Sequence, residues 1–276
     1  MAANETHVDS LPKTGLLLIG MGLGRMEGMT LEALEAATLA DHRRYEAYTA
    51  LWPEAELARL EAKVGPIQRV MRPEVEDPTE LLELAASSLV ALLVVGDPLQ
   101  ATTHVDLQLR AAEAGVSCRV LHGVSITTLV TGAVGLSNYK FGRQTTFTYP
   151  YGNWIATSPL EVVASNWSQN LHSLVLLDLD PTGQGFGDQR PMTPADAVRS
   201  LGMMWHSMRT NEADGSAEDA PATAFQRSMQ TDFLEQSMEA MQVVLCSDMG
   251  TPEQSIVATT VGAVSYTHLR AHETSN

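Results

Sequence analysis

The pattern of apolar positions predicts a first strand that ends in a glycine-rich loop. Residues 16–19 form a continuous apolar run, and glycines follow at positions 20, 22 and 24. A short apolar run closed by glycines is typical of a strand that is buried on both faces of a parallel sheet. Thr30 then caps a segment with the apolar spacing of a helix. Its apolar residues are Leu31, Leu34 and Ala37.

Strands and helices continue to alternate up to about residue 124. Continuous apolar runs at 89–95 and 118–121 predict two more buried strands. Helical spacing follows Pro53 and Pro78 and recurs over residues 107–114. The order strand, helix, strand, helix, strand predicts a parallel sheet covered by helices.

The pattern changes after about Val124. Alternating positions over 139–151 predict strands with turns, and apolar runs predict further strands. These runs cover 174–179 and 243–246. A helix is expected from Thr193 and Pro194, because an N-cap residue precedes a proline, and the acidic stretch 211–223 is expected to be a surface loop.

We therefore expect an α/β fold with two α/β domains and mainly parallel or mixed sheets. The expected divisions are a flexible arm (1–14), an N-terminal domain (15–126) and a truncated C-terminal domain (127–264). The last residues, 265–276, are polar, follow no amphipathic period and are similar to translated sequencing-adapter read-through. We interpret them as a non-native tail.

Composition narrows the function classes. Hydrophobic residues make up 44% of the 276 residues and charged residues 18%, which predicts a packed core. The net charge of −16 argues against nucleic acid as a ligand. The longest apolar runs fall well short of the ~20 residues that span a bilayer, so no membrane association is expected. Cys118 and Cys246 lack the spacing of a redox or zinc motif, and we expect buried, unreactive thiols and a cytoplasmic location.

Two histidines at the end of the chain have the spacing of metal ligands. His268 and His272 are four residues apart, as two ligands on one helix face would be. No third ligand accompanies them, and they lie in the segment that we interpret as a non-native tail. No metal site is therefore expected.

Polar residues follow the predicted strands. Ligands of parallel α/β sheets bind at this place, beyond the carboxyl ends of the strands. The glycines at 20–24 allow backbone N–H groups to approach a ligand, or they form only a tight turn. Asp97 could accept hydrogen bonds from a ribose or an amine, or it could close an Asx turn. His104 could orient a substrate, but we favour a structural role at the start of a helix.

Several blocks along the chain resemble the diphthine synthase family, in the class of methyltransferases that also holds the tetrapyrrole methylases. The blocks, in order, are LLLIGMGLG, LEAL, YEAYT, LLVVGDPLQATTHVDLQLRA, RVLHGVSITTLVTGAVGL, YKFG and HSLVLLDLD. The resemblance runs from about residue 15 to 180. It resumes more weakly at PMTPADAV and DMGTPEQSIVATT.

The resemblance implies S-adenosyl-L-methionine as cofactor, bound in a cleft between two domains, and a homodimer. It implies a protein substrate, translation elongation factor 2, whose aminocarboxypropyl histidine is methylated on its amino group in diphthamide biosynthesis. The implied cofactor residues are Leu23, Asp97, Gln100, Ser125, Ile126, Leu177 and Met249. Gln100 stands where the family usually has glycine, and a late histidine of the family has no counterpart.

The resemblance assigns no catalytic residue. A model α-amino group has a pKa of ~8, so about a tenth of it is neutral at pH 7 and a general base is not obligatory. Aromatic residues cluster at 139–154 and could hold a methylated ammonium, or they could serve the sheet core or a dimer interface. They are Tyr139, Phe141, Phe147, Tyr149, Tyr151 and Trp154.

Two alternative functions remain open. A tetrapyrrole precursor C-methyltransferase would have the same fold, but such enzymes usually carry a GxGPGD loop where this chain has GMGLGR at 20–25. A non-catalytic protein-binding module is the other alternative. Asp97 and Ser125 disfavour the binding module, and the altered C-terminus favours it.

Overall fold

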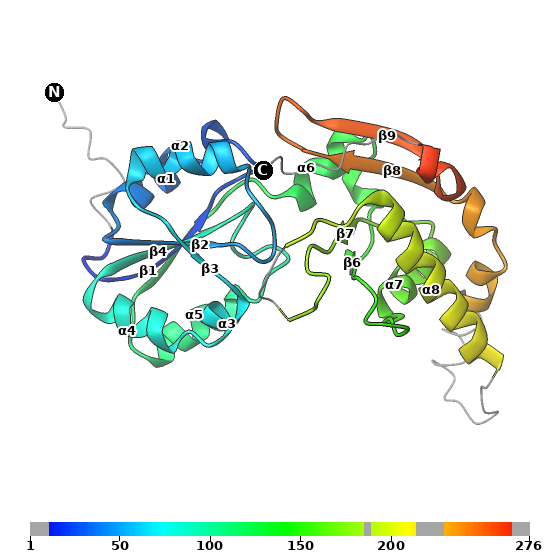
Figure 1. The fold of residues 1–276 in the computed structure, drawn as a ribbon, viewed down its shortest axis with the longest axis horizontal. Coiled ribbons are helices and arrows are strands. Elements are labelled where there is room, and N and C mark those ends of the chain that lie inside the picture. The colour runs from blue at the N-terminus through cyan, green and yellow to red at the C-terminus, as the bar shows by residue number, and fades with distance from the viewer. Residues whose placement is uncertain (1–10, 185–188, 214–228, 267–276) are drawn as a thin grey trace. The chain divides into compact units, whose positions relative to one another are not determined.

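The computed structural model describes residues 11–184, 189–213 and 229–266, and it divides into two compact units (Figure 1). The first unit contains the chain up to Leu129 together with the short segment Asp248–Gln254. The second contains residues 130–247 and the chain from Ser255 onward. Residues 1–10 of the expected arm, 214–223 of the expected acidic loop and 267–276 of the tail, with His268 and His272, lie outside the described residues. The first three residues of the expected loop, 211–213, are helical.

A five-stranded parallel sheet forms the centre of the first unit. The strand order is β3-β2-β4-β1-β5, so β1 lies between two strands that follow it much later in the chain. The strands are β1 Gly15–Gly20, β2 His42–Glu46, β3 Gln68–Val70, β4 Leu89–Val94 and β5 Cys118–Leu121. Every residue of β1 and of β4 is buried, as expected when helices cover both faces.

Helices cover both faces of this sheet, with α1 and α2 on one face and α3, α4 and α5 on the other (Figure 1). Their bounds are α1 Leu31–Leu39, α2 Glu54–Val64, α3 Arg72–Glu76, α4 Thr79–Ser87 and α5 His104–Glu113. Alternate residues of β1 serve the two cores: Leu17 and Ile19 pack on the α1 side, and Leu16 and Leu18 on the other. The Thr30 side chain accepts a hydrogen bond from the Ala33 N–H and so caps α1, as predicted.

The second unit contains two small sheets and a helical layer. Strands β6 Thr145–Phe147 and β7 Val175–Leu177 pair in parallel, and β8 Gln242–Ser247 pairs antiparallel with β9 Ser255–Thr260. The labelled helices are α6 Ile126–Ala133, which crosses the division between the units, α7 Ser158–Ser168 and α8 Pro194–Ala213. Residues 229–234 are also helical. The fully buried residues of the core include Leu160, Met204 and Phe233.

The sequence predictions were confirmed for the continuous apolar runs and were wrong for several polar or aromatic segments. Strands β2, β3 and β9 and helices α3, α6 and α7 were missed. Residues 139–151 contain one three-residue strand, β6, where several strands were expected. Tyr149 packs in the core instead, and Tyr151 pairs with Trp154 across a tight turn.

A buried ion pair joins β2 to the start of α5. Nε2 of His104 lies 2.6 Å from Oε2 of Glu46, and each side chain is only 1% exposed. The other ring nitrogen, Nδ1, lies 3.0 Å from the Pro98 carbonyl oxygen. Both nitrogens face acceptors, which suits the doubly protonated imidazolium. Burial opposes the charge, but Glu46 and the Pro98 carbonyl together raise the pKa of His104 above its ordinary value. His104 lies at the start of α5, as expected, but its contribution there is this buried contact with Glu46 and not a helix cap.

This pair predicts a pH-dependent contribution to stability. Because the folded-state pKa of His104 is raised, its contribution is complete below about pH 6.5, the unfolded value, and is lost as pH rises through the folded value. His104→Gln should lower the free energy of unfolding by about 3 kcal/mol at pH 6, and by less at pH 9. Urea denaturation at the two pH values measures this difference. His172→Gln, at an exposed histidine, is the control, and an equal loss for His104→Gln at both pH values would contradict the assignment.

Candidate functional site

Three glycines bring the carboxyl ends of three neighbouring strands into backbone contact. Gly20 ends β1, Gly96 follows β4 and Gly123 follows β5. A Cβ atom on Gly20 would lie 2.5 Å from the Gly123 nitrogen, and one on Gly123 would lie 2.3 Å from the Gly96 carbonyl oxygen. Gly22 and Gly96 also exchange two backbone hydrogen bonds, of 3.2 and 2.9 Å. The glycine loop at 20–24 and the loop around Gly96 therefore form one backbone surface, which no single sequence motif reveals.

Asp97 is buried at this surface. Its Oδ1 accepts a hydrogen bond from the Leu99 N–H at 2.9 Å, which is the Asx turn of the alternative interpretation. Its Oδ2 lies 2.8 Å from Nδ1 of His122 and accepts a longer bond, of 3.2 Å, from the Gly123 N–H. One carboxylate thus connects the end of β4 to the end of β5. This arrangement gives Asp97 a positioning role that does not require a ligand.

Ser125 begins the next helix beside the same glycines. Its hydroxyl accepts a 3.3 Å hydrogen bond from the Thr127 N–H, which makes Ser125 the N-cap of α6. A Cβ atom on Gly96 would lie 3.8 Å from the Ser125 Cα, in ordinary van der Waals contact. Ile126 is half-buried, and the exposed Gln100 contacts Thr127 through its side-chain carbonyl at 3.5 Å. Gly96, Gln100, Ser125 and Ile126 therefore lie around one end of the sheet.

A segment from late in the chain packs against the glycine loop within the first unit. A Cβ atom on Gly250 would lie 2.8 Å from the Cβ of Leu23, so only a residue without a side chain fits there. Met249, the neighbour of Gly250, is buried, with 8% of its surface exposed. Leu23 and Met249 are 226 positions apart in the sequence, and the structure places both at this end of the first unit.

The structure therefore places six of the seven expected cofactor residues in the first unit. Leu177 is the exception, because it lies on β7 in the second unit, where its side chain is 40% exposed. The cofactor-binding role of the seven residues stays a prediction. The described ranges contain no group of three or more His, Cys, Asp or Glu side chains that could hold a metal ion.

Sequence reasoning missed His122 as a candidate functional residue. It follows β5 directly, its imidazole is 69% exposed, and its Nδ1 faces the buried Asp97 carboxylate. A carboxylate accepts hydrogen bonds, so Nδ1 of His122 is the donor in this contact. His122 is the first residue of the sequence HGVSI at 122–126, which belongs to the resemblance. Its contact with Asp97 joins residues 25 positions apart, so the sequence alone did not reveal it.

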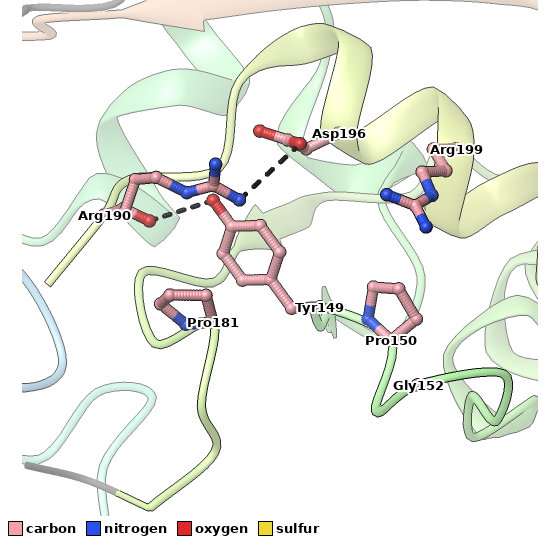
Figure 2. A pocket seen from close by; sticks show the side chains of 7 residues that line it. All are labelled: Tyr149, Pro150, Gly152, Pro181, Arg190, Asp196 and Arg199. Atoms are coloured by element: carbon pink, nitrogen blue, oxygen red, sulfur yellow. Dashed lines mark hydrogen bonds and ion pairs between the residues drawn. The ribbon is translucent and has the colours of Figure 1, made fainter.

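The second unit contains a pocket lined by part of the aromatic cluster. Its lining residues are Tyr149, Pro150, Gly152, Pro181, Arg190, Asp196 and Arg199 (Figure 2). The other aromatic residues have different settings. Phe147 is in the core, Phe141 is half-buried, and Tyr139 is 90% exposed. Of the six aromatic residues in the cluster, Tyr149 is therefore the one that lines this pocket.

Both cysteines are half-buried rather than fully buried. Burial raises the pKa of the Cys118 thiol to about 11 and also raises that of Cys246. Both thiols are therefore protonated at neutral pH and poorly nucleophilic. No helix in the described ranges has both the length and the hydropathy to cross a membrane.

Comparison with known proteins assigns the chain to a family. The sequence profile of the tetrapyrrole (corrin/porphyrin) methylases matches residues 15–213. The chain therefore belongs to this family, and it is a methyltransferase. The protein that it resembles within the family is diphthine synthase.

The resemblance to diphthine synthase appears in both sequence and structure. The diphthine synthase of Methanoregula boonei is 37% identical over 191 residues, which are 68% of this chain and 74% of the relative. That of Methanocorpusculum labreanum is 39% identical over 59% of this chain and 66% of the relative.

Solved structures agree with these relatives. A crystal structure of diphthine synthase has 27% identity and a TM-score of 0.70, covering 91% of this chain and 84% of the other. A putative diphthine synthase from Entamoeba histolytica has 26% identity and a TM-score of 0.72, covering 94% and 89%.

The glycine contact predicts a position that tolerates no side chain. Gly123→Ala would place a methyl group 2.3 Å from the Gly96 carbonyl oxygen, so the backbone must shift. We expect the free energy of unfolding to fall by at least about 2 kcal/mol, measured by urea denaturation. Gly28→Ala is the matched control in the same unit, because nothing lies within 4 Å of a Cβ atom there. Equal stability of the two variants would show that the contact is not tight in solution.

Proposed function

We propose that this chain transfers methyl groups from S-adenosyl-L-methionine to the amino group of the aminocarboxypropyl histidine on translation elongation factor 2, in diphthamide biosynthesis. The observation that carries the proposal is the shared backbone surface of Gly20, Gly96 and Gly123, bordered by Ser125. It occurs in a chain that resembles diphthine synthases over most of its length. We further propose a homodimer, as the resemblance implies, and a cytoplasmic location, which suits two free cysteines.

The residues at the end of the sheet fit a sulfonium nucleoside. The bridge between Gly22 and Gly96 gives a backbone surface without side chains. A Cβ atom on Gly96 would occupy the space between this surface and Ser125. Leu23, Ile126 and Met249 add apolar surface. We propose that Leu23, Asp97, Gln100, Ser125, Ile126 and Met249 hold the cofactor. For Leu177, the same role rests on the resemblance alone. Because the Asp97 carboxylate already has three hydrogen-bond partners, we expect Asp97 and Gln100 to contribute mainly backbone groups.

When bound, S-adenosyl-L-methionine supplies an electrophilic methyl group, and the protein must present an uncharged amine. A model α-amino group is mostly protonated at pH 7. We propose that Nε2 of His122 accepts the proton of the ammonium group, while Asp97 holds the ring through Nδ1 and stabilises the imidazolium that forms. The fold contributes to this role by orienting the His122 ring through its contact with Asp97.

The binding half of this proposal is tested by calorimetry with S-adenosyl-L-methionine. The wild-type chain should bind the cofactor, and Leu23→Ala should weaken binding on the order of tenfold, because apolar contact is lost. Leu31→Ala removes an 86% exposed leucine from the same unit and should leave the affinity unchanged. A thermal melt of each variant separates lost contact from unfolding.

The transfer half is tested by mass spectrometry of elongation factor 2 carrying the aminocarboxypropyl histidine. Incubation with chain and cofactor should increase the mass by whole methyl groups at that residue. Cofactor binding without a mass change would contradict the proposed substrate, and a lack of cofactor binding would favour a non-catalytic module.

The proposed role of His122 predicts a change in the pH profile. His122→Asn should lower kcat/KM for elongation factor 2 by about a hundredfold at pH 7. The deficit should shrink toward pH 9, where the amine deprotonates without assistance. His206→Asn, at an exposed position of α8, is the control. A full rate for His122→Asn at pH 7, or a deficit independent of pH, would refute a proton-accepting role.

A further inference from the structure

The pocket in the second unit has the size of a side chain rather than of a cofactor. Its volume is about 260 Å³. Pockets for drug-sized ligands have volumes of roughly 300–1,000 Å³. It is bordered by the segment from Tyr149 to Gly152, by Pro181 and Arg190, and by the first two turns of α8 (Figure 2). A ligand in this space is therefore a small group, or one side chain of a larger molecule.

Arg190 is held at the edge of this pocket. Its backbone N–H donates to the Leu179 carbonyl at 2.8 Å, and its carbonyl accepts the Tyr149 hydroxyl at 2.9 Å. Its guanidinium carbon lies 5.0 Å from the centre of the Tyr149 ring, a cation–π distance. The backbone anchors and the ring contact together limit where this positive charge can lie.

The second arginine is not neutralised by the acidic residue of the pocket. Asp196 is used in capping α8, because its Oδ2 accepts hydrogen bonds from the N–H and the hydroxyl of Thr193, at 3.0 and 2.8 Å. Its Oδ1 lies 3.9 Å from Arg190. Within the described residues, Arg199 has no carboxylate at ion-pair distance. The charged residues that line the pocket are therefore two arginines and one aspartate, in a chain whose net charge is −16.

Exposed aromatic rings lie next to the pocket on the same turn. Tyr151 and Trp154 pair across a turn that contains Gly152, a lining residue, and their rings stack at 6.2 Å. They are 43% and 62% exposed. Tyr, Trp and Arg are the residue types that dominate binding energy in protein interfaces. Two arginines in a small concavity favour a planar carboxylate, and the aromatic rings favour a polypeptide as its carrier.

We propose that this pocket binds a carboxylate of the protein substrate, with Arg199 and Arg190 as the anion-binding groups and Tyr151 and Trp154 as the surrounding contact surface. The proposal rests on the proposed function for the identity of that protein. It concerns binding of the substrate, and the methyl-transfer step does not depend on it.

The first experiment tests the pocket without any methylation. Glutarate is titrated into the full chain, and the side-chain Nε–Hε signals of the arginines are followed by NMR. The signals of Arg190 and Arg199 should shift together, and that of Arg143, an exposed arginine of the same unit, should not. In Arg199→Met, the shift of Arg190 should be strongly reduced. An absence of selective shifts in the wild-type chain would overturn the proposal.

The second experiment tests the protein as the source of the carboxylate. Arg199→Met should raise KM for elongation factor 2 about tenfold or more, with kcat and cofactor affinity unchanged. Arg199→Lys keeps the charge but loses the planar fork, so its KM should lie between the two. Arg143→Met removes the same charge elsewhere in the unit and should leave KM unchanged.

The remaining outcomes also give a decision. An unchanged KM for Arg199→Met would show that the pocket does not receive the substrate, and the proposal would fall. A loss of dimer in sedimentation with unchanged KM would identify a second copy of the chain as occupant, which also overturns it. If the wild-type chain does not methylate elongation factor 2, the proposed function fails, and the glutarate titration alone decides whether the pocket binds carboxylates.

Discussion

The backbone contact among Gly20, Gly96 and Gly123 is the constraint on which the candidate site depends. Three parallel strands end at one point, and a Cβ atom on Gly20 or Gly123 would lie 2.7 Å or less from backbone atoms of the neighbouring glycines. Only because those side chains are missing can the loop after β4 approach the loop after β5. The buried carboxylate of Asp97 then spans the two loops and fixes His122 and the Gly123 N–H. The packing requirement and the proposed chemistry therefore use the same few residues.

The loop after β4 is held by a second device, the buried ion pair of Glu46 and His104. Pro98 joins the two, because its carbonyl oxygen faces Nδ1 of His104 while its neighbour Asp97 reaches toward β5. The loop is thus fixed from opposite sides, by β2 through the ion pair and by β5 through the carboxylate. A loop that is held from both sides costs little further conformational entropy when a ligand binds, which is the physical advantage of pre-organisation.

The parts of the fold that were predicted from sequence are those in which local pattern decides structure. Continuous apolar runs gave β1 and β4, and capping residues gave the starts of α1 and α8. Strand β2, with the sequence HRRYE, was missed because its polar residues are satisfied by distant or backbone partners. Arg43 donates to three carbonyl oxygens near the end of α1, and Glu46 pairs with His104. The pairing of Asp97 with His122 and the approach of Gly250 to Leu23 are non-local, and no periodicity contains them.

The position of the segment Asp248–Gln254 has a consequence for the order of assembly. The chain leaves the first unit at residue 129 and returns to it only at residue 248, for seven residues. During synthesis the parallel sheet can form long before this segment emerges from the ribosome, since domains generally fold as they are made. The neighbourhood of Leu23 and Met249 is then completed only after residue 254 has been made. A product that ended before residue 248 would contain an intact sheet but would lack the segment that packs against Leu23.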